Sequence, residues 1–262
     1  MVVTNRYESL GTHLASHFFK RSNNALHGRC FSSMKHMAPI VISLGGSLIA
    51  PATGIDTDFL REFHDLILRQ TKKGQRFIII GGGGGTARAY MNAAKAVAPL
   101  EPDDMDWLGI HSCRLNGHLL RTIFRKIAHP IMVKDPRKKT VWKDPVLIGT
   151  AWRPGASSDY CAVRFARTHG ASVVINLSNI ERVYSKDPKH HADAVPYDKM
   201  NWDQVKKIVG DKWVPGSSAP FDPIATIWAA RWKMKVIVAR GSDLENTKNI
   251  LNSRGFIGTI IE

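Results

Sequence analysis

Residues 77–88 have the sequence FIIIGGGGGTAR, in which four apolar residues run directly into five glycines. A short continuous apolar run of this kind is typical of a strand buried on both faces of a parallel sheet. After the glycines, apolar residues recur at helical spacing, at Ala87, Tyr90, Met91, Ala94 and Val97. The stretch therefore predicts a strand, a glycine turn and a helix that begins near Thr86.

The same succession of elements is predicted on both sides of this stretch. Before it, an apolar run at 40–44 leads into Gly45-Gly46, and a helix is marked by Phe59, Leu60, Phe63, Leu66 and Ile67. After it, short strands are expected at 131–133, 146–148, 173–177 and 236–239, and helices over 115–127, 158–169 and 222–231. Strands that alternate with helices predict an α/β fold, a three-layer αβα sandwich with a mainly parallel central sheet.

The composition is that of a globular protein with a high positive charge. Of 262 residues, 44% are hydrophobic and 23% are charged, and the formal net charge is +15. No apolar run approaches the length of a membrane span. The basic residues are dispersed, without an arginine-rich helix, an RNP-like aromatic motif or a zinc finger. The charge therefore favours a site for polyanionic nucleotides and makes a nucleic-acid partner the weaker expectation.

Two features bear on the compartment in which the protein works. Cys30, Cys113 and Cys161 form no CxxC pair and lack the spacing of metal ligands, which fits a reducing compartment. Residues 1–36 carry five Lys or Arg against one acid, Glu8. This basic leader resembles an organellar transit segment, and an over-extended start or added sequence is equally compatible with it. We expect the leader to be disordered or cleavable, and the protein to be cytoplasmic unless the leader directs it to an organelle.

Three Gly- or Ser-rich segments follow predicted strands. They are Gly45-Gly46-Ser47, Gly81 to Gly85, and the segment PGASSD at 154–159, which opens a helix. In doubly wound sheets, ligands gather beyond the carboxyl ends of the strands, and the N–H groups at helix N-termini favour phosphate. The sequence therefore predicts a phosphate site at this edge. It lacks the P-loop motif, and Thr86 stands where a dinucleotide fingerprint needs its third glycine.

Further motifs stand between and after these segments. They are DWLGI at 106–110, Arg114-x-Asn116, Asn179-Ile180-x-x-Val183-Tyr184-Ser185-x-Asp187-Pro188, and GTII at 258–261. Together with SLGGS at 43–47, GGGGGTAR at 81–88 and PGASSDYCA at 154–162, they resemble the amino acid kinase superfamily. Their order and spacing are most similar to those of archaeal-type uridylate kinases, over roughly residues 38–262. The resemblance implies transfer of the γ-phosphoryl group of ATP to UMP, giving UDP and ADP in pyrimidine nucleotide biosynthesis.

The resemblance also implies which residues form the site. ATP is expected to contact Gly46, Ser47, Gly84, Arg88, Ser178, Asn179, Tyr184 and Asp187. UMP is expected to contact Gly83, Asp106, Ala151, Trp152, Arg153, Pro154, Gly155, Ala156 and Ser157. Asp159 and Arg88 are the expected catalytic residues, and Mg²⁺ is expected to arrive with ATP and not on assigned protein ligands. The resemblance further implies an acceptor lobe of about 37–165, an ATP lobe of about 166–262, and a homohexamer.

The chain departs from the superfamily's pattern at three places. Ser43 stands where many members have a lysine, so the cation that neutralises the transferring phosphoryl group is unassigned among three candidates, Arg88, Arg153 and Lys186. Glu181-Arg182 replaces the Asp-Gly that precedes Val-Tyr, which affects the nucleotide side. Ala151-Trp152-Arg153 replaces smaller or different residues, which affects the identity of the acceptor.

Other functions remain open on the sequence alone. One is another small-acceptor kinase of the same fold, acting on isopentenyl phosphate, an amino-acid carboxylate or carbamate. Thr86-Ala87-Arg88 and the lack of an extra regulatory domain within the 262 residues disfavour it. Ser43 and Arg182 leave open a non-enzymatic nucleotide-binding or storage protein. The +15 charge leaves open a nucleic-acid-binding regulator.

Several of the singled-out residues have simpler structural explanations. Asp106 could cap a helix start, Tyr184 could be a core aromatic, and Arg88 could be a solvent-facing helix residue. Asp187-Pro188 could be only a turn signal, and His190-His191 is expected in a solvated loop. Four tryptophans are expected to be packing residues and not base-stacking platforms: Trp202, Trp213, Trp228 and Trp232.

Overall fold

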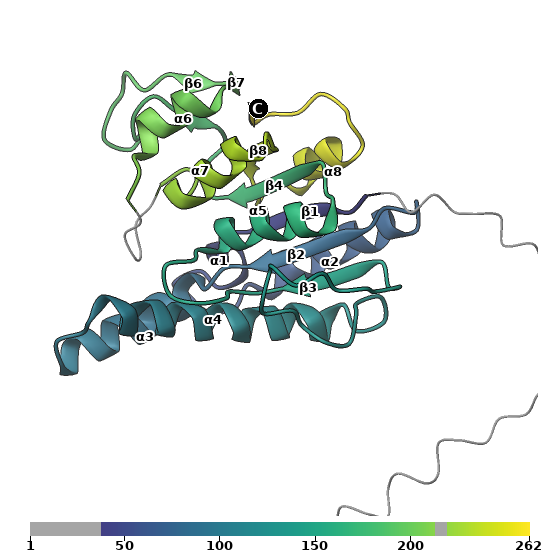
Figure 1. Ribbon diagram of the computed structural model, residues 1–262, viewed down its shortest axis with the longest axis horizontal. Helices are drawn as coiled ribbons and strands as arrows, with labels where there is room; N and C mark the ends of the chain where they lie inside the picture. Colours follow the sequence, from purple (N-terminus) through teal and green to yellow (C-terminus); the bar gives the residue numbers. More distant parts are fainter. Residues whose placement is uncertain (1–37, 213–218) are drawn as a thin grey trace, which may run out of the picture. The chain divides into compact units, whose positions relative to one another are not determined.

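Parallel strands form the centre of the fold (Figure 1). The computed structural model describes residues 38–212 and 219–262. The parallel strands are β1 Ile40–Leu44, β2 Phe77–Gly81, β3 Val146–Gly149, β4 Val173–Ser178 and β8 Lys235–Arg240. Ile42 lies opposite Ile79 on one side and Ile175 on the other, so β1 is flanked by β2 and β4. The carboxyl ends of β1, β2 and β4 therefore meet at one edge of the sheet.

Shorter strands extend the sheet and add a hairpin. The order in the main sheet is β3-β2-β1-β4-β8-β9-β7. Here β9 is Thr259–Ile261, antiparallel to β8, and β7 is Lys199–Met200, parallel to β9. A separate antiparallel pair joins β5 Val183–Tyr184 to β6 Pro196–Tyr197. The sheet is thus mainly parallel, as predicted.

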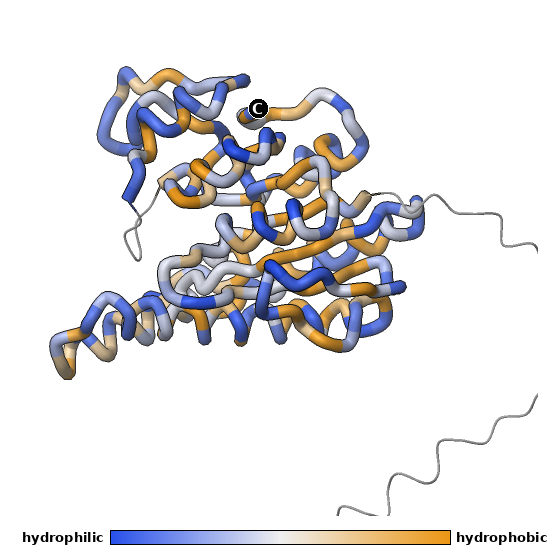
Figure 2. The backbone as a smooth tube through the Cα atoms, in the orientation of Figure 1, coloured by the Kyte–Doolittle hydropathy of each residue, from blue (hydrophilic) through white to orange (hydrophobic). Residues whose placement is uncertain are grey.

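Helices cover both faces of the sheet. The core on one face includes side chains from α5 Ser158–His169, α6 Trp202–Val209 and α7 Pro223–Arg231. The core on the other face includes side chains from α1 Gly46–Ile49, α2 Thr57–Thr71, α4 Pro102–Ile123 and α8 Leu244–Leu251. Successive residues of a strand alternate between the two cores: Val41 belongs to the first and Ile42 to the second. Apolar colour accordingly runs along the central strands in Figure 2. The predicted three-layer αβα fold is confirmed.

Helix α3, Gly84–Val97, packs against α4, and the two extend beyond the sheet at the end nearer their connection (Figure 1). Ala87 is the buried residue of α3, whereas Tyr90 is 59% exposed and Val97 is 88% exposed. Nowhere in residues 38–212 and 219–262 does a helix have both the length and the apolar content needed to cross a membrane.

The structure corrects two of the predicted elements. Residues 131–133 are not a strand, because only Val133 forms an isolated bridge, with Gly149, while Ile131 is 69% exposed. The helix expected over 115–127 is α4, which begins at Pro102 and ends at Ile123. Its first turn is acidic and exposed, with Pro102 at the start, so it carries no apolar periodicity that a sequence pattern could register. The predicted strands β1, β2, β3, β4 and β8 and the helices at 158–169 and 222–231 are confirmed to within one or two residues.

Candidate active site

Two glycine loops cross at the carboxyl ends of β1 and β2. The Gly82 N–H donates to the Leu44 carbonyl at 2.9 Å, and the Gly45 N–H donates to Leu177 of β4 at 2.8 Å. A Cβ atom added to Gly46 would overlap the backbone of Gly82, Gly83 and Gly84. The crossing therefore requires glycine at position 46, because no side-chain movement can relieve a clash with backbone.

Both loops lead directly into helices. Gly45 is the N-cap of α1, and Gly83 is the N-cap of α3, which starts in the left-handed region at Gly84 with φ +59°. The first N–H groups of a helix lack intrahelical partners, and the helix dipole places positive potential there. The predicted glycine residues of the site, Gly46, Gly83 and Gly84, are therefore brought together in a place suited to phosphate.

Helix α4 fixes two of the loops at the site. The Asn116 side-chain amide donates to the carbonyl oxygens of Gly82 at 2.8 Å and Gly83 at 3.2 Å. Arg114 Nη2 donates to the Trp152 carbonyl at 2.9 Å. Because residues two apart on a helix point in different directions, one helix can hold the second glycine loop and the segment 151–157. This explains the Arg114-x-Asn116 spacing.

Asp159 lies in the first turn of α5 and faces the first strand. Ser43 Oγ donates to Asp159 Oδ1 at 2.8 Å, so the residue that stands at the lysine position binds the predicted catalytic carboxylate. Burial raises the pKa of Asp159, although hydrogen bonds from Ser43 and Asn176 act in the opposite direction. The side chain therefore sits in a poorly solvated place where a nearby positive charge would be strongly favoured.

A second carboxylate, Asp222, was not singled out from the sequence and is more deeply buried than Asp159. It is 4% exposed, caps α7 by accepting from the Ala225 N–H at 2.5 Å, and has no hydrogen-bond partner for Oδ2 among the described residues. Burial raises the pKa of Asp222 to about 7, and the charge of Asp159 acts in the same direction. The two carboxylates thus form one electrostatically coupled pair. Asp222-Pro223 is a recognisable helix start, but only the packing of α5 on α7 brings it to Asp159.

Asp106 and the segment 151–157 lie together. Asp106 Oδ2 accepts from the Gly155 N–H at 2.7 Å, and Gly155 has a positive φ of +74°. The N-cap of α4 is Glu101, so the alternative that Asp106 caps a helix start is wrong. Ser157 ends the segment as the N-cap of α5, accepting from the Tyr160 N–H at 3.0 Å. We call residues 151–157 the acceptor loop; they comprise Ala151, Trp152, Arg153, Pro154, Gly155, Ala156 and Ser157.

The residues predicted for adenosine follow β4 and β5. Ser178 ends β4, where its hydroxyl accepts from the Ile180 N–H at 3.4 Å, and Asn179 follows it exposed. Tyr184 ends β5 and is only partly buried, so it is not a core aromatic. Asp187 is exposed and accepts from the Lys189 N–H at 2.9 Å, which makes it a turn residue whatever else it binds. None of these observations tests the adenosine contacts, which stay predictions.

Other predictions about single residues have mixed outcomes. Ser47 lies in α1 beside the glycine crossing, and Arg88 is exposed near the start of α3. His190 and His191 are both exposed, as expected for a solvated loop. Packing roles are confirmed for Trp202, Trp228 and Trp232, which belong to or border the core on the α5 face. Trp213 and the leader at 1–36 lie outside the described residues.

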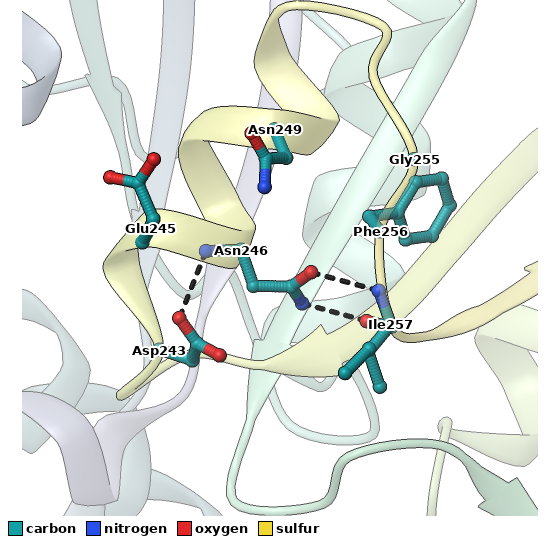
Figure 3. A pocket seen from close by; sticks show the side chains of 7 residues that line it. All are labelled: Asp243, Glu245, Asn246, Asn249, Gly255, Phe256 and Ile257. Atoms are coloured by element: carbon teal, nitrogen blue, oxygen red, sulfur yellow. Dashed lines mark hydrogen bonds between the residues drawn. The ribbon is translucent and has the colours of Figure 1, made fainter.

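A cavity of about 440 Å³ has none of the predicted site residues in its lining (Figure 3). It is lined by Asp243, Glu245, Asn246, Asn249, Gly255, Phe256 and Ile257. The Asn246 amide bonds both the N–H and the carbonyl of Ile257, at 2.8 and 2.7 Å, and Asp243 caps α8. These polar groups are already used to close the turn between α8 and β9. The polar groups that line the cavity therefore serve the local structure, and no residue predicted for the chemistry is among them.

The described residues contain no group of three or more His, Cys, Asp or Glu placed to hold a metal ion. Ser43, which binds Asp159, lies in β1 just before the glycine crossing with its two helix N-termini. Helix N-termini favour phosphate, so the arrangement suits an α/β enzyme that handles nucleotide phosphates.

Known proteins agree with this class. The sequence model of the amino acid kinase family matches residues 38–240. The uridylate kinase of Thermoplasma volcanium is 32% identical over 228 residues, which cover 85% of this chain and 97% of that protein. That of Methanocorpusculum labreanum is 29% identical over 228 residues, 86% of this chain and 96% of that protein. The crystal structure of uridylate kinase from Archaeoglobus fulgidus matches with a TM-score of 0.73 at 28% identity, covering 86% of this chain and all of that one. The chain belongs to the amino acid kinase family.

Proposed function

We propose that this protein transfers the γ-phosphoryl group of ATP to UMP and so produces ADP and UDP. The observation that supports it most directly is the 2.7 Å hydrogen bond between Asp106 and Gly155. It joins the residue expected to recognise the nucleoside to the loop expected to hold its phosphate. The relatives that match over most of this chain carry the name uridylate kinase.

The reaction needs positioning and charge neutralisation more than covalent help from the protein. An oxygen of the acceptor phosphate attacks the γ-phosphorus in line, a new P–O bond forms, and the bond to the ADP oxygen breaks. The acceptor phosphate is already ionised at neutral pH, so no general base is required. The backbone N–H groups at Gly46 and Gly84 would hold the phosphates, while the acceptor loop holds the nucleophile.

Magnesium fits the carboxylate pair. Mg²⁺ prefers oxygen ligands and is commonly bound through one or two carboxylates together with phosphates. Asp159 and Asp222 offer such oxygens, and Asp222 Oδ2 has no hydrogen-bond partner among the described residues. When bound with ATP, the ion would offset the negative charge of the phosphates. The two carboxylates would hold it, directly or through water, and their raised pKa values would fall once it is present.

Arg88 is our candidate for the cation missing at Ser43. Lys186 is held by Asp193 at 2.7 Å on the β5–β6 hairpin, and Arg153 is stacked on Trp152 in the acceptor loop. Arg88 remains exposed near the N-terminus of α3, beside the glycine crossing. An arginine there can reach phosphate with two N–H groups at once.

We also propose that the protein works as a homo-oligomer. Four large side chains on α3 and α4 are exposed: Tyr90, Val97, Trp107 and Leu115. Apolar side chains gathered on one projecting pair of helices favour burial against another copy of the chain. Sedimentation equilibrium would measure the state directly.

An ADP-release assay with ATP and Mg²⁺ tests the function. The acceptors are UMP, CMP, dUMP, isopentenyl phosphate and glutamate, and the Asp159→Asn protein, purified in parallel, controls for contaminating kinases. We expect UMP to have the highest kcat/KM. A higher value for isopentenyl phosphate or glutamate would transfer the function to another kinase of this fold. ATP binding without turnover on any acceptor would indicate a nucleotide-binding protein.

A further inference from the structure

Two arginines from different segments stack on the indole of Trp152. The guanidinium of Arg137 lies 4.2 Å from the ring centroid, and that of Arg153 also lies 4.2 Å from it. Arg153 belongs to the acceptor loop, whereas Arg137 belongs to the segment between α4 and β3. Guanidinium groups stack well on aromatic faces because they are planar and weakly hydrated. Trp152 therefore connects Arg137, which lies outside the acceptor loop, to Arg153 within it.

Arg137 is itself fixed. Its Nε donates to Asp135 Oδ1 at 3.0 Å and its Nη2 to Asp135 Oδ2 at 2.9 Å, a paired contact that sets the guanidinium plane. The hydrogen bond from Arg137 holds the pKa of Asp135 below its usual value. The Asp135 carboxylate also offsets the charge of Arg137, so two cations can approach one ring with reduced repulsion.

The segment that carries Arg137 is anchored to the protein. Thr168 Oγ1 donates to the Pro136 carbonyl at 2.7 Å, and the Thr140 N–H donates to His169 Nε2 at 3.1 Å. Both partners lie at the C-terminal end of α5, the helix that carries Asp159 near its start. Arg137 thus stacks on Trp152 from a segment that hydrogen bonds hold to α5.

The backbone of Trp152 is restrained as well. Its carbonyl accepts from Arg114 at 2.9 Å, and Asp106 holds Gly155 further along the loop. The loop is therefore held on its main chain by α4 and on its Trp152 side chain by Arg137. Arg153, the other arginine of the stack, is exposed.

We propose that the stack of Asp135, Arg137, Trp152 and Arg153 is a positioning device, which holds the Arg153 guanidinium where the acceptor's phosphate binds. Arg137 acts through Trp152 and Arg153 and does not touch the acceptor. An exposed arginine loses much side-chain freedom when it binds a ligand, and stacking removes part of that freedom beforehand. A fixed guanidinium can bind an anionic phosphate with two N–H groups at once and so favours a phosphorylated acceptor over a neutral one. This inference rests on the proposed function, since it deepens the account of the acceptor site.

Steady-state kinetics on a double-mutant cycle tests the positioning role. We expect Arg137→Ala to raise KM for UMP about two- to fivefold, the scale of an exposed cation–π contact, with kcat and KM for ATP little changed. The double variant Arg137→Ala/Arg153→Ala should be no worse than Arg153→Ala alone, because Arg137 acts only through Arg153. Arg137→Lys should recover little, since an ammonium keeps the charge without the planar stack.

Lys138→Ala is the matched control. Lys138 is the next residue, is exposed and carries the same charge, so its variant should behave as wild type. If Arg137→Ala and Lys138→Ala raise KM for UMP equally, the loss of positive charge alone explains the effect, and the proposal is overturned. Additive effects in the double variant would overturn it too, because they would show that Arg137 acts independently of Arg153.

A readout that does not depend on turnover separates this inference from the proposed function. In protein labelled with 5-fluorotryptophan, the ¹⁹F resonance of Trp152 is the one lost in Trp152→Phe. We expect it to shift on adding UMP and not on adding uridine, which lacks the phosphate, and to respond weakly in Arg137→Ala. Absence of UMP phosphorylation by wild type would sink the proposed function. If the Trp152 resonance responds to none of the phosphorylated acceptors in the panel, the positioning role is wrong.

Discussion

The glycine crossing and the acceptor loop are held in different ways. At the crossing, Gly46 and the Gly82–Gly84 backbone lie so close that no side chain fits between them. At the acceptor loop, the contacts come from side chains on separate segments: Asp106 binds Gly155, and Arg137 stacks on Trp152. The first region is set by backbone geometry and the second by side chains. Substitutions should therefore disrupt the crossing altogether but change the loop in graded steps.

The largest effect is expected from Gly46→Ala. Its added methyl would overlap backbone atoms of the second glycine loop, so the strands' ends must move apart. We expect the free energy of unfolding to fall by about 3 kcal/mol or more. Turnover should fall by at least about 10²-fold, the scale of a 1 Å misplacement. Gly255→Ala is the control, because a Cβ there meets nothing within 4 Å. Thermal unfolding and initial rates would measure stability and turnover. Similar losses of both in Gly46→Ala and Gly255→Ala would show that the crossing does not require glycine at position 46.

Asp159→Asn should have the next largest effect, now on catalysis alone. Asparagine keeps an oxygen for the Ser43 hydroxyl but removes the charge beside the phosphates. We expect kcat to fall by about 10²-fold, as for loss of one electrostatic stabiliser, with the melting temperature nearly unchanged. Asp203→Asn, in the first turn of α6, is the matched control and should retain full activity. Near-normal turnover of folded Asp159→Asn would exclude Asp159 from the mechanism.

Asp106→Ala tests the acceptor side, where effects should be graded. A hydrogen bond to a charged acceptor contributes roughly 1.5–3 kcal/mol, so KM for UMP should rise at least about tenfold. KM for ATP should move little, and kcat should be less affected than KM. Asp104→Ala, an exposed residue two positions earlier on α4, should behave as wild type. Equal increases in both Michaelis constants would indicate a purely structural role for Asp106 through Gly155.

Asp222 should make stability depend on pH in the protein without nucleotide or metal. Its pKa is raised from 3.8 to about 7, so the folded state binds more protons than the unfolded state between these values. Stability should therefore fall as pH rises from about 4 to 7 and level off above. The fall should be on the order of 10 °C in melting temperature, and Asp222→Asn, which still caps α7, should abolish most of it. Calorimetry would measure the melting temperature against pH. The same dependence in wild type and Asp222→Asn would show that Asp222 is not its cause.

The sequence was sufficient where structure is local. Short apolar runs that end in glycine predicted β1 and β2, and helical spacing predicted α5. The start of α4 was missed because Pro102 and the acidic residues after it are exposed. Asp222 was predicted at a helix start, but its place beside Asp159 depends on how α5 packs on α7. Long-range placement of polar side chains leaves no periodicity, so it cannot be predicted from spacing.

The smallest effect is expected from removing the leader, because neither region depends on it. The buried residues of the two cores run from Val41 to Ile261, and Met37–Glu262 forms one compact unit. A chain starting at Met37 should therefore melt within about 2 °C of the full chain, as surface changes do. It should also bind ATP with the same affinity, since every predicted nucleotide contact follows Met37. Calorimetry and titration of ATP on both chains would measure this. A large fall in melting temperature would show that residues 1–36 contribute to the core, and a fall in affinity alone would place them at the nucleotide site.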